Sequence, residues 1–271
     1  MALEPTFQRD GDLIIPGEAA RGPWSRETVG GGQLTSLLAS GVELHADDEL
    51  HPARITFDLF RAVPWAPMQL VTRVVRNGRR IRVVDVSLLH DDVEVARASG
   101  LLIRRTEQPP GQVAQPSTNV MPSPDGFEPD VPLDPTAKRD PRAGESRSVR
   151  RTGGPEPAVR WIRRSAPLLP DHELTPLERV AATADAASPV SNRSDEGLYF
   201  VNPDSTLLLH RMPVGEWICV ETVARGAADG VSFSTCMLHD TSGPIGSATT
   251  AGVATALNEL IGRRASHAPG A

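Results

Sequence analysis

A carboxylate among small apolar residues is the feature of this sequence best placed to do chemistry. Asp185 lies in a predicted helix, and its neighbours are alanines: Ala181, Ala182, Ala184, Ala186 and Ala187. A carboxyl group there would be poorly solvated, and desolvation raises the pKa of an acid because it disfavours the charged form. The plain alternative is an acid on the solvent face of a helix, which an alanine-lined helix supports poorly.

A run of glycines offers a second kind of chemistry. Gly30, Gly31 and Gly32 precede a series of apolar residues with the 3.6-residue period of a helix: Leu34, Leu37, Leu38 and Val42. Main-chain N–H groups at a helix start can approach an oxyanion, and the helix dipole favours negative charge there. A glycine run by itself also fits a plain tight turn, so both interpretations stay open.

The elements around these residues occur twice in the sequence. Residues 54–104 recur, much diverged, as residues 204–253, and each copy has an arginine–proline strand exit, a turn glycine and a Leu-His-Asp corner. The separation between the exit arginine and the corner histidine differs by one residue between the copies. Such internal repetition predicts a pseudo-symmetric molecule, with its chemistry where the two halves face each other.

Each copy is predicted to be a helix followed by an antiparallel meander. Strand-like runs in the first copy cover residues 53–61, 68–75, 81–89 and 93–103, with a hairpin turn at Asn77-Gly78. A second helix is predicted to begin at Thr175-Pro176, which supplies a cap and a first-turn proline. A short strand around Trp161 comes before it, and strand-like runs follow it over residues 198–201, 206–211, 217–224, 231–238 and 245–254.

Between the two copies the composition changes. Residues 106–157 hold 11 of the 25 prolines of the chain and show no apolar periodicity. Proline cannot donate to a β-ladder and disfavours helix, which is typical of an extended linker. The prediction is therefore an α+β protein with an N-terminal module over residues 1–105, a proline-rich linker over 106–157 and a C-terminal module over 158–271.

Composition excludes several classes of protein. The net charge of −6 and the pI near 5.7 disfavour a nucleic-acid or anionic-membrane binder. Cys219 and Cys236 lie in predicted strands, which favours buried free thiols and a reducing cytoplasm. No secretion signal or run of about 20 apolar residues is visible, and the histidines and cysteines show no metal-ligand spacing. We therefore expect a cytoplasmic protein without a metal or redox cofactor.

The arrangement resembles the double hotdog acyl-CoA thioesterases of the acyl-CoA thioesterase II (TesB-like) family. The stretches that carry the resemblance are residues 30–33, 55–61, 76–79, 174–185 and 202–211, although Val29 replaces the usual aromatic before the first of them. Their order and spacing are more specific than any one motif, and the match covers nearly everything except the linker. The resemblance implies two helices back to back, each inside its own half of a continuous sheet.

The resemblance also implies a reaction, the hydrolysis of a fatty acyl-CoA thioester by an oriented water. The family orients this water with an aspartate on the second helix, a serine or threonine at the next strand and a glutamine on the last strand. These positions fall on Asp185, Asn202 and Thr250. Asparagine can still hold a water, because its amide both donates and accepts, but a threonine hydroxyl is shorter than the usual amide. The main-chain amides of Gly31 to Gln33 would hold the carbonyl oxygen.

Several alternatives remain open at this stage. The first helix has no aspartate to match Asp185, and only Glu43 near its end is acidic, so one working site is expected rather than two. The missing glutamine motivates a second function, an acyl-CoA or acyl-carrier binding protein of the same fold with weak or no turnover. Arginines around the first hairpin could contact CoA phosphates, although a solvated basic turn fits equally well: Arg76, Arg79, Arg80 and Arg82. Hotdog sheets commonly pair further, so a homodimer is also open.

Overall fold

The computed structural model describes residues 3–22, 25–114, 120–131 and 144–255. The first half of the chain forms a hairpin, a short 3-10 helix, a long helix and a four-stranded meander. These elements are β1 (Phe7–Asp10), β2 (Leu13–Pro16), η1 (Glu18–Ala20), α1 (Gly31–Glu43), β3 (Leu50–Leu59), β4 (Met68–Asn77), β5 (Ile81–His90) and β6 (Val93–Arg104).

The second half repeats this plan with a shorter, interrupted helix. Its elements are η2 (Pro124–Gly126), β7 (Gly144–Arg150), β8 (Val159–Arg164), α2 (Pro176–Ala184), α3 (Ala187–Asn192), β9 (Phe200–Val201), β10 (Asp204–Leu209), β11 (Trp217–Ala228), β12 (Val231–Asp240) and β13 (Gly243–Ala254). The predicted strands are therefore confirmed to within a few residues. The β1–β2 hairpin is an addition that the sequence did not predict.

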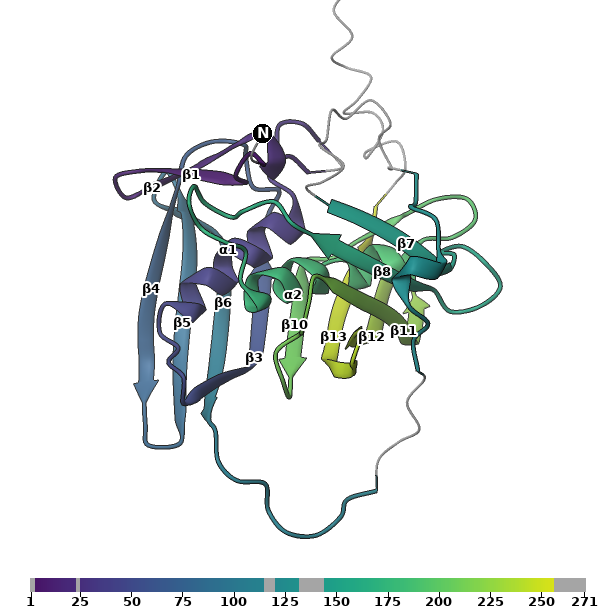
Figure 1. Ribbon diagram of the computed structural model, residues 1–271. Helices are drawn as coiled ribbons and strands as arrows, with labels where there is room; N and C mark the ends of the chain where they lie inside the picture. Colours follow the sequence, from purple (N-terminus) through teal and green to yellow (C-terminus); the bar gives the residue numbers. More distant parts are fainter. Residues whose placement is uncertain (1–2, 23–24, 115–119, 132–143, 256–271) are drawn as a thin grey trace, which may run out of the picture.

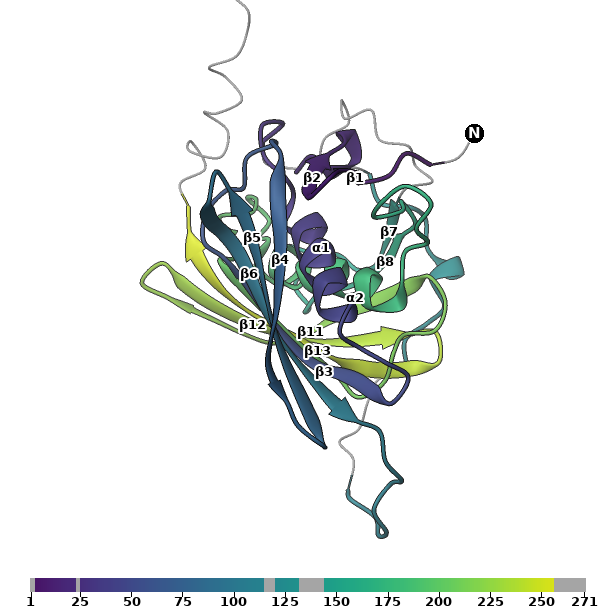
Figure 2. The ribbon, with the colours of Figure 1, turned by 90° about the vertical axis from the view of Figure 1, so that its left-hand side faces the viewer.

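All strands join one antiparallel sheet in the order β1-β2-β4-β5-β6-β3-β10-β13-β12-β11-β8-β7, with β9 paired to β13. Counted outward from the β3–β10 pair, the order β3, β6, β5, β4 matches β10, β13, β12, β11, which confirms the predicted duplication. The Leu-His-Asp corners end β5 and β12 at equivalent places. The sheet curves around α1 and α2, which lie side by side on its concave face (Figures 1 and 2).

The two helices run antiparallel and touch at both ends. Near one end the Thr35 hydroxyl donates to the Ala181 carbonyl oxygen at 2.9 Å. At the other end the Thr175 hydroxyl donates to a Glu43 carboxylate oxygen at 2.7 Å. The expected back-to-back arrangement is thus observed, and it brings the start of each helix to the end of the other.

The second helix is broken at the residue of greatest interest. The α-helix ends at Ala184, Asp185 is its C-terminal cap residue, and α3 begins at Ala187. The sequence accounts for the break, because Pro189 has no N–H and its ring clashes with the carbonyl four residues earlier, that of Asp185. Asp185 therefore lies at the junction of two short helices rather than inside one long helix.

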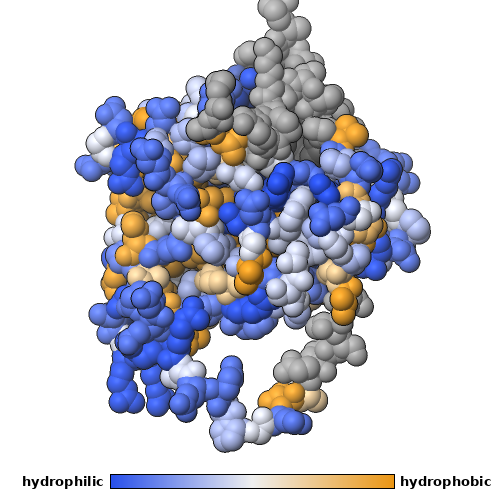
Figure 3. Space-filling model, viewed as in Figure 1, coloured by the Kyte–Doolittle hydropathy of each residue, from blue (hydrophilic) through white to orange (hydrophobic). Residues whose placement is uncertain are grey.

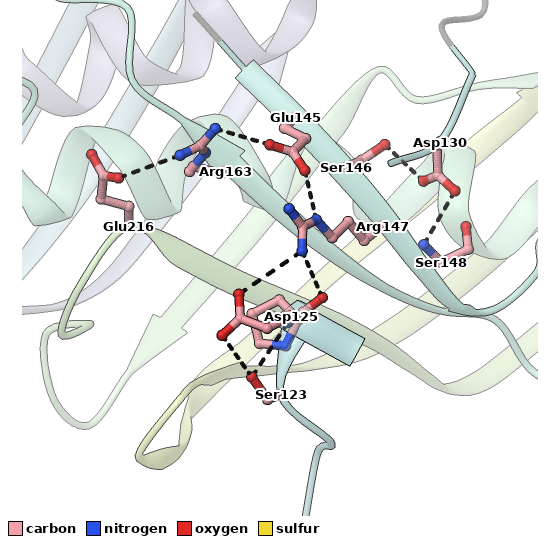
Figure 4. Close-up of polar contacts among 10 residues, drawn as sticks. Ser123, Asp125, Asp130, Glu145, Ser146, Arg147, Ser148, Arg163 and Glu216 are labelled. Atoms are coloured by element: carbon pink, nitrogen blue, oxygen red, sulfur yellow. Dashed lines mark hydrogen bonds and ion pairs between the residues drawn. The ribbon is translucent and has the colours of Figure 1, made fainter. Parts of the chain in front are cut away.

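The proline-rich segment is partly built into the fold. Its last portion forms β7, which pairs with β8 and extends the sheet. Figure 4 shows how Asp130 is held, with its carboxylate accepting hydrogen bonds from the Ser146 hydroxyl and the Ser148 amide. Arg147 donates to the Pro124 carbonyl oxygen. Trp161 of β8 donates to the Pro122 carbonyl oxygen at 2.9 Å. The predicted extended linker is therefore fastened to the second half at its C-terminal end.

The core and surface agree with the composition. One buried apolar cluster includes residues of both halves, and Cys219 and Cys236 are buried free thiols, as expected. In the view of Figure 3 the apolar residues form separate patches among hydrophilic ones. No helix in the described ranges is long and apolar enough to cross a membrane.

Candidate active site

Asp185 lies directly opposite the glycine turn of the first half. A Cβ atom at position 31 would lie 2.6 Å from Oδ1 and 2.7 Å from Oδ2 of Asp185. No side chain fits in that space, so glycine at this position is what allows the start of α1 to approach the carboxylate. The expected convergence of the two halves therefore has a direct steric cause.

The start of α1 keeps two main-chain N–H groups available for a ligand. Gly30 donates to the Ala20 carbonyl oxygen at 2.9 Å, and Gln33 donates to the Gly30 carbonyl oxygen at 3.1 Å. No side chain caps this helix, and across the described residues no hydrogen bond engages the amides of Gly31 and Gly32. Of the three predicted oxyanion donors, the Gln33 amide is committed within the turn, whereas the two glycine amides stay available.

Asn202 contacts the carboxylate of Asp185, the residue with which the family resemblance grouped it. Its Nδ2 donates to Oδ1 of Asp185 at 3.0 Å and to the Asp204 carbonyl oxygen at 3.3 Å. Asn202 lies in the link between β9 and β10, where Pro203 and Asp204 turn the chain. The amide is therefore aimed by the turn at the junction of α2 and α3.

The carboxyl group of Asp185 has an unusual electrostatic environment. Burial raises the pKa of Asp185 above the usual aspartate value, while the Asn202 hydrogen bond and the positive charge of Arg164 act in the opposite direction. Asp185 is half-buried, so part of the residue stays accessible to solvent. A carboxylate with a raised pKa is a stronger base than an ordinary exposed aspartate.

Thr250 is placed differently from the other predicted site residues. It is buried, on β13, and its hydroxyl lies 2.9 Å from the Ser234 hydroxyl on β12. Over the residues that the structure describes, Thr250 has no hydrogen bond to Asp185 or Asn202. The structure thus brings Asp185, Asn202 and the glycine turn together, and it leaves the Thr250 hydroxyl engaged with a neighbouring strand.

Arg164 is a site residue that the sequence did not indicate. It ends β8, and its Nη2 would lie 3.0 Å from a Cβ atom at Gly32. The Ala182 carbonyl oxygen lies on the same side, 2.8 Å from that Cβ position. No motif marks this arginine among its neighbours, because only the packing of β8 against the start of α1 places its guanidinium near Asp185.

The opposite end of the helix pair lacks an equivalent set of donors. Pro176 occupies the first position of α2 and has no N–H to offer. The Thr175 hydroxyl accepts from the Glu178 amide at 3.1 Å and donates to Glu43, so it is already engaged. The two ends of the helix pair therefore present different groups, and one working site stays a prediction.

The basic hairpin after β4 lies far from Asp185. Arg82 donates to the His45 carbonyl oxygen at 2.6 Å, just beyond the C-terminal end of α1. A helix rises 1.5 Å per residue, so the length of α1 separates this hairpin from Gly31 by about 20 Å. Within the described part of the chain, no cluster of three or more His, Cys, Asp or Glu side chains could hold a metal ion.

A duplicated helix-in-sheet fold whose helix start meets a desolvated carboxylate of the other half defines a class: the molecule is a double hotdog protein. Residues 20–103 match the family model of the acyl-CoA thioesterase N-terminal domain, and residues 110–254 match that of the acyl-CoA thioesterase C-terminal domain. The chain therefore belongs to the acyl-CoA thioesterase family, as the resemblance of its sequence predicted.

Solved structures share this fold at low sequence identity. A putative thioesterase from Novosphingobium aromaticivorans is 20% identical with a TM-score of 0.72, over 93% of this chain and 99% of that one. The tesB protein of Mycobacterium avium subsp. paratuberculosis is 15% identical with a TM-score of 0.67, over 92% and 95%. Acyl-CoA thioesterase II TesB2 from Mycobacterium marinum is 14% identical with a TM-score of 0.62, over 92% and 95%. No curated protein sequence matches the chain.

Proposed function

We propose that this protein hydrolyses the thioester of a fatty acyl-CoA with a water oriented by Asp185. The observation that carries the proposal is the approach of Gly31 to the Asp185 carboxylate, 2.6 Å from a Cβ position to Oδ1. A thioester carbonyl oxygen on the amides of Gly31 and Gly32 would place its carbon beside a water held by Asp185. Fixed donors and a positioned base are the two elements that acyl transfer to water requires.

The proposed reaction has two steps. Asp185 takes a proton from the water as its oxygen bonds to the carbonyl carbon, and the two glycine amides stabilise the negative charge that develops on the carbonyl oxygen. The carbon–sulfur bond then breaks, and the proton passes to the departing CoA thiolate, which leaves a free fatty acid and CoA thiol. Asn202 would fix the carboxylate through the 3.0 Å bond to Oδ1, so that the second oxygen faces the water.

Asp185→Asn is the direct test of this proposal. We expect thiol release from a series of acyl-CoAs of increasing chain length to fall by about 10²- to 10⁴-fold, because the variant cannot take a proton. Asp229→Asn is the matched control, since Asp229 is an exposed turn residue with φ 51° that asparagine also tolerates. Full activity in Asp185→Asn would refute a role for this carboxylate.

The alternative function is an acyl-CoA or acyl-carrier binding protein of the same fold with weak or no turnover. The engagement of the Thr250 hydroxyl with Ser234 favours it, because this side chain then offers little to a water beside Asp185. The same assay separates the two functions, since tight binding of acyl-CoA without thiol release from the unaltered protein would establish the alternative.

A homodimer and a cytoplasmic location remain predictions of this proposal. Several side chains on the outer face of the sheet are apolar and exposed, among them Val71, Leu208, Phe233 and Val253. A second copy of the chain could cover these side chains. Light scattering of the protein as it elutes from a sizing column would measure the mass of the assembly. The buried free thiols of Cys219 and Cys236 support a reducing compartment.

A further inference from the structure

A cavity of about 520 Å³ lies beside the C-terminal end of α3. It forms because β8 pairs with β11 only as far as Glu221, while β11 continues to Ala228. The Thr222 amide donates to the Ala158 carbonyl oxygen at 3.0 Å, and beyond that point no strand of the described residues lies along this edge of β11. Residues 153–158 and 190–195 form the other walls.

Two arginines give this cavity, called here the Arg193 pocket, a positive lining. Arg225 donates to the Asn192 side-chain oxygen at 3.1 Å, and its guanidinium lies 5.8 Å from the centre of the Phe200 ring. Both of these partners are neutral. The side chain of Arg193 has no hydrogen bond or ion pair within the described residues, although the residue is half-buried.

The guanidinium of Arg160 adds a third positive charge near Arg193. Burial lowers the pKa of Arg193, the nearby guanidinium of Arg160 lowers it further, and no carboxylate opposes these effects. Arg160 has its own counter-ion, with its Nε 3.3 Å from Asp130. Two carboxylates, those of Glu156 and Asp195, also line the pocket, and both residues are more exposed than Arg193. A half-buried guanidinium without a counter-ion gains more from an incoming anion than an exposed one does.

Two segments of the pocket wall also approach each other closely. Gly153 has φ 76°, and a Cβ atom there would lie 2.6 Å from the Ser194 carbonyl oxygen. The glycine lets the loop before β8 pack directly on the segment after α3, next to Arg193. The pocket is therefore a consequence of how two distant segments meet, and it belongs to neither alone.

We propose that the Arg193 pocket binds a phosphate group, and specifically the nucleotide phosphates of the acyl-CoA. This inference rests on the proposed function for its choice of ligand. The pocket lies about 10 Å from Asp185, because α3 follows that residue and a helix rises 1.5 Å per residue. The thioester and the phosphates of CoA are joined by one flexible arm, so a single molecule could occupy both places.

Calorimetric titration of the full-length protein with adenosine 3′,5′-bisphosphate tests the pocket without requiring turnover. We expect Arg193→Gln to weaken binding about tenfold or more, as the loss of a charge-assisted hydrogen bond does, and Arg193→Lys to retain part of the affinity. Arg79→Gln is the matched control, because it removes an arginine of the rival basic hairpin. Equal affinity in the unaltered protein and in Arg193→Gln would overturn the proposal, as would a loss confined to Arg79→Gln.

A second titration with inorganic phosphate separates the two sources of the anion. Tighter binding of the nucleotide than of phosphate supports the CoA assignment, and equal binding of both overturns it. In the thiol-release assay, Arg193→Gln should raise KM for acyl-CoA and leave KM for acyl-pantetheine, which has no phosphate, unchanged. If the protein releases no thiol but binds the nucleotide through Arg193, the proposed hydrolysis fails while this pocket stands.

Discussion

The surroundings of Asp185 act on its pKa in opposite directions, and the chemistry of this residue depends on the balance between them. Burial raises its pKa, which makes the carboxylate a better base, while Asn202 and the charge of Arg164 keep the ionised form accessible. A catalytic base works best when its pKa lies near the operating pH. At the scale of single residues, Arg164 is therefore expected to act on the reaction through Asp185 and not by touching the water.

Removing the charge of Arg164 should shift the pH dependence of hydrolysis. Asp185 must be ionised to take a proton, so kcat/KM falls as the pH drops through its pKa. Arg164 lowers that pKa, so Arg164→Gln should move the acid limb of the profile to higher pH, and Arg164→Lys should move it less. Arg163→Gln is the adjacent control, because Arg163 pairs with Glu145 instead. An acid limb that stays in place in Arg164→Gln would show that the two groups are uncoupled.

At the scale of elements, the two helices are matched as an antiparallel pair whose ends carry different chemistry. One end presents a glycine turn to Asp185, and the other presents a capping box in which Thr175 and Glu178 satisfy each other's main-chain amides. Glu43 enters this second end from α1 and accepts the Thr175 hydroxyl. Burial raises the pKa of Glu43, and the negative charge of Glu178 adds to the effect.

Glu43→Gln should therefore stabilise the protein at neutral pH. A carboxyl group whose pKa is raised by folding weakens the folded state once it is ionised, so the variant should gain most above that pKa and lose its advantage as the pH falls toward the ordinary value of 4.5. The glutamine oxygen can still accept the Thr175 hydroxyl. Urea unfolding at pH 7 and pH 4 would measure the difference, with the exposed Glu107→Gln as control. Lower stability at pH 7 would contradict this account.

At the scale of the whole molecule, the halves are joined by structure that neither could complete alone. Strands β3 and β10 pair across the centre, with Thr56 opposite Thr206. The amides of Thr6 and Phe7 bond to the carbonyl oxygens of Pro167 and Leu168 in the second half, each at 2.8 Å. The buried apolar cluster crosses the same boundary. The molecule should therefore behave as one cooperative unit.

Single-tryptophan variants would test this cooperativity. Trp65 reports on the first half, and Trp161 on the second, where it is buried. In variants that keep only Trp65 or only Trp161 of the four tryptophans, urea unfolding followed by fluorescence should give the same midpoint and the same slope, as a two-state transition requires. Transitions separated along the urea axis would instead show that each half is stable on its own.

The sequence alone determined the duplication, the order of helix and meander, and the strand positions. These follow from local patterns: alternation along strands, helical spacing, and cap and turn residues. The grouping of Asp185 with Asn202 and the glycine turn was instead implied by the resemblance to the thioesterase family. The break in the second helix also has a local cause in the sequence, which is Pro189, four residues after Asp185.

Only the tertiary structure decided which groups near the site are free and which are engaged. The commitment of the Gln33 amide, the pairing of Thr250 with Ser234 and the position of Arg164 each depend on segments that meet through packing. The same holds for β7, which forms inside a proline-rich segment because the open edge of β8 supplies its hydrogen bonds. A hydrogen bond to a distant segment produces no periodic pattern in the sequence of either segment, so only the folded structure shows whether it forms.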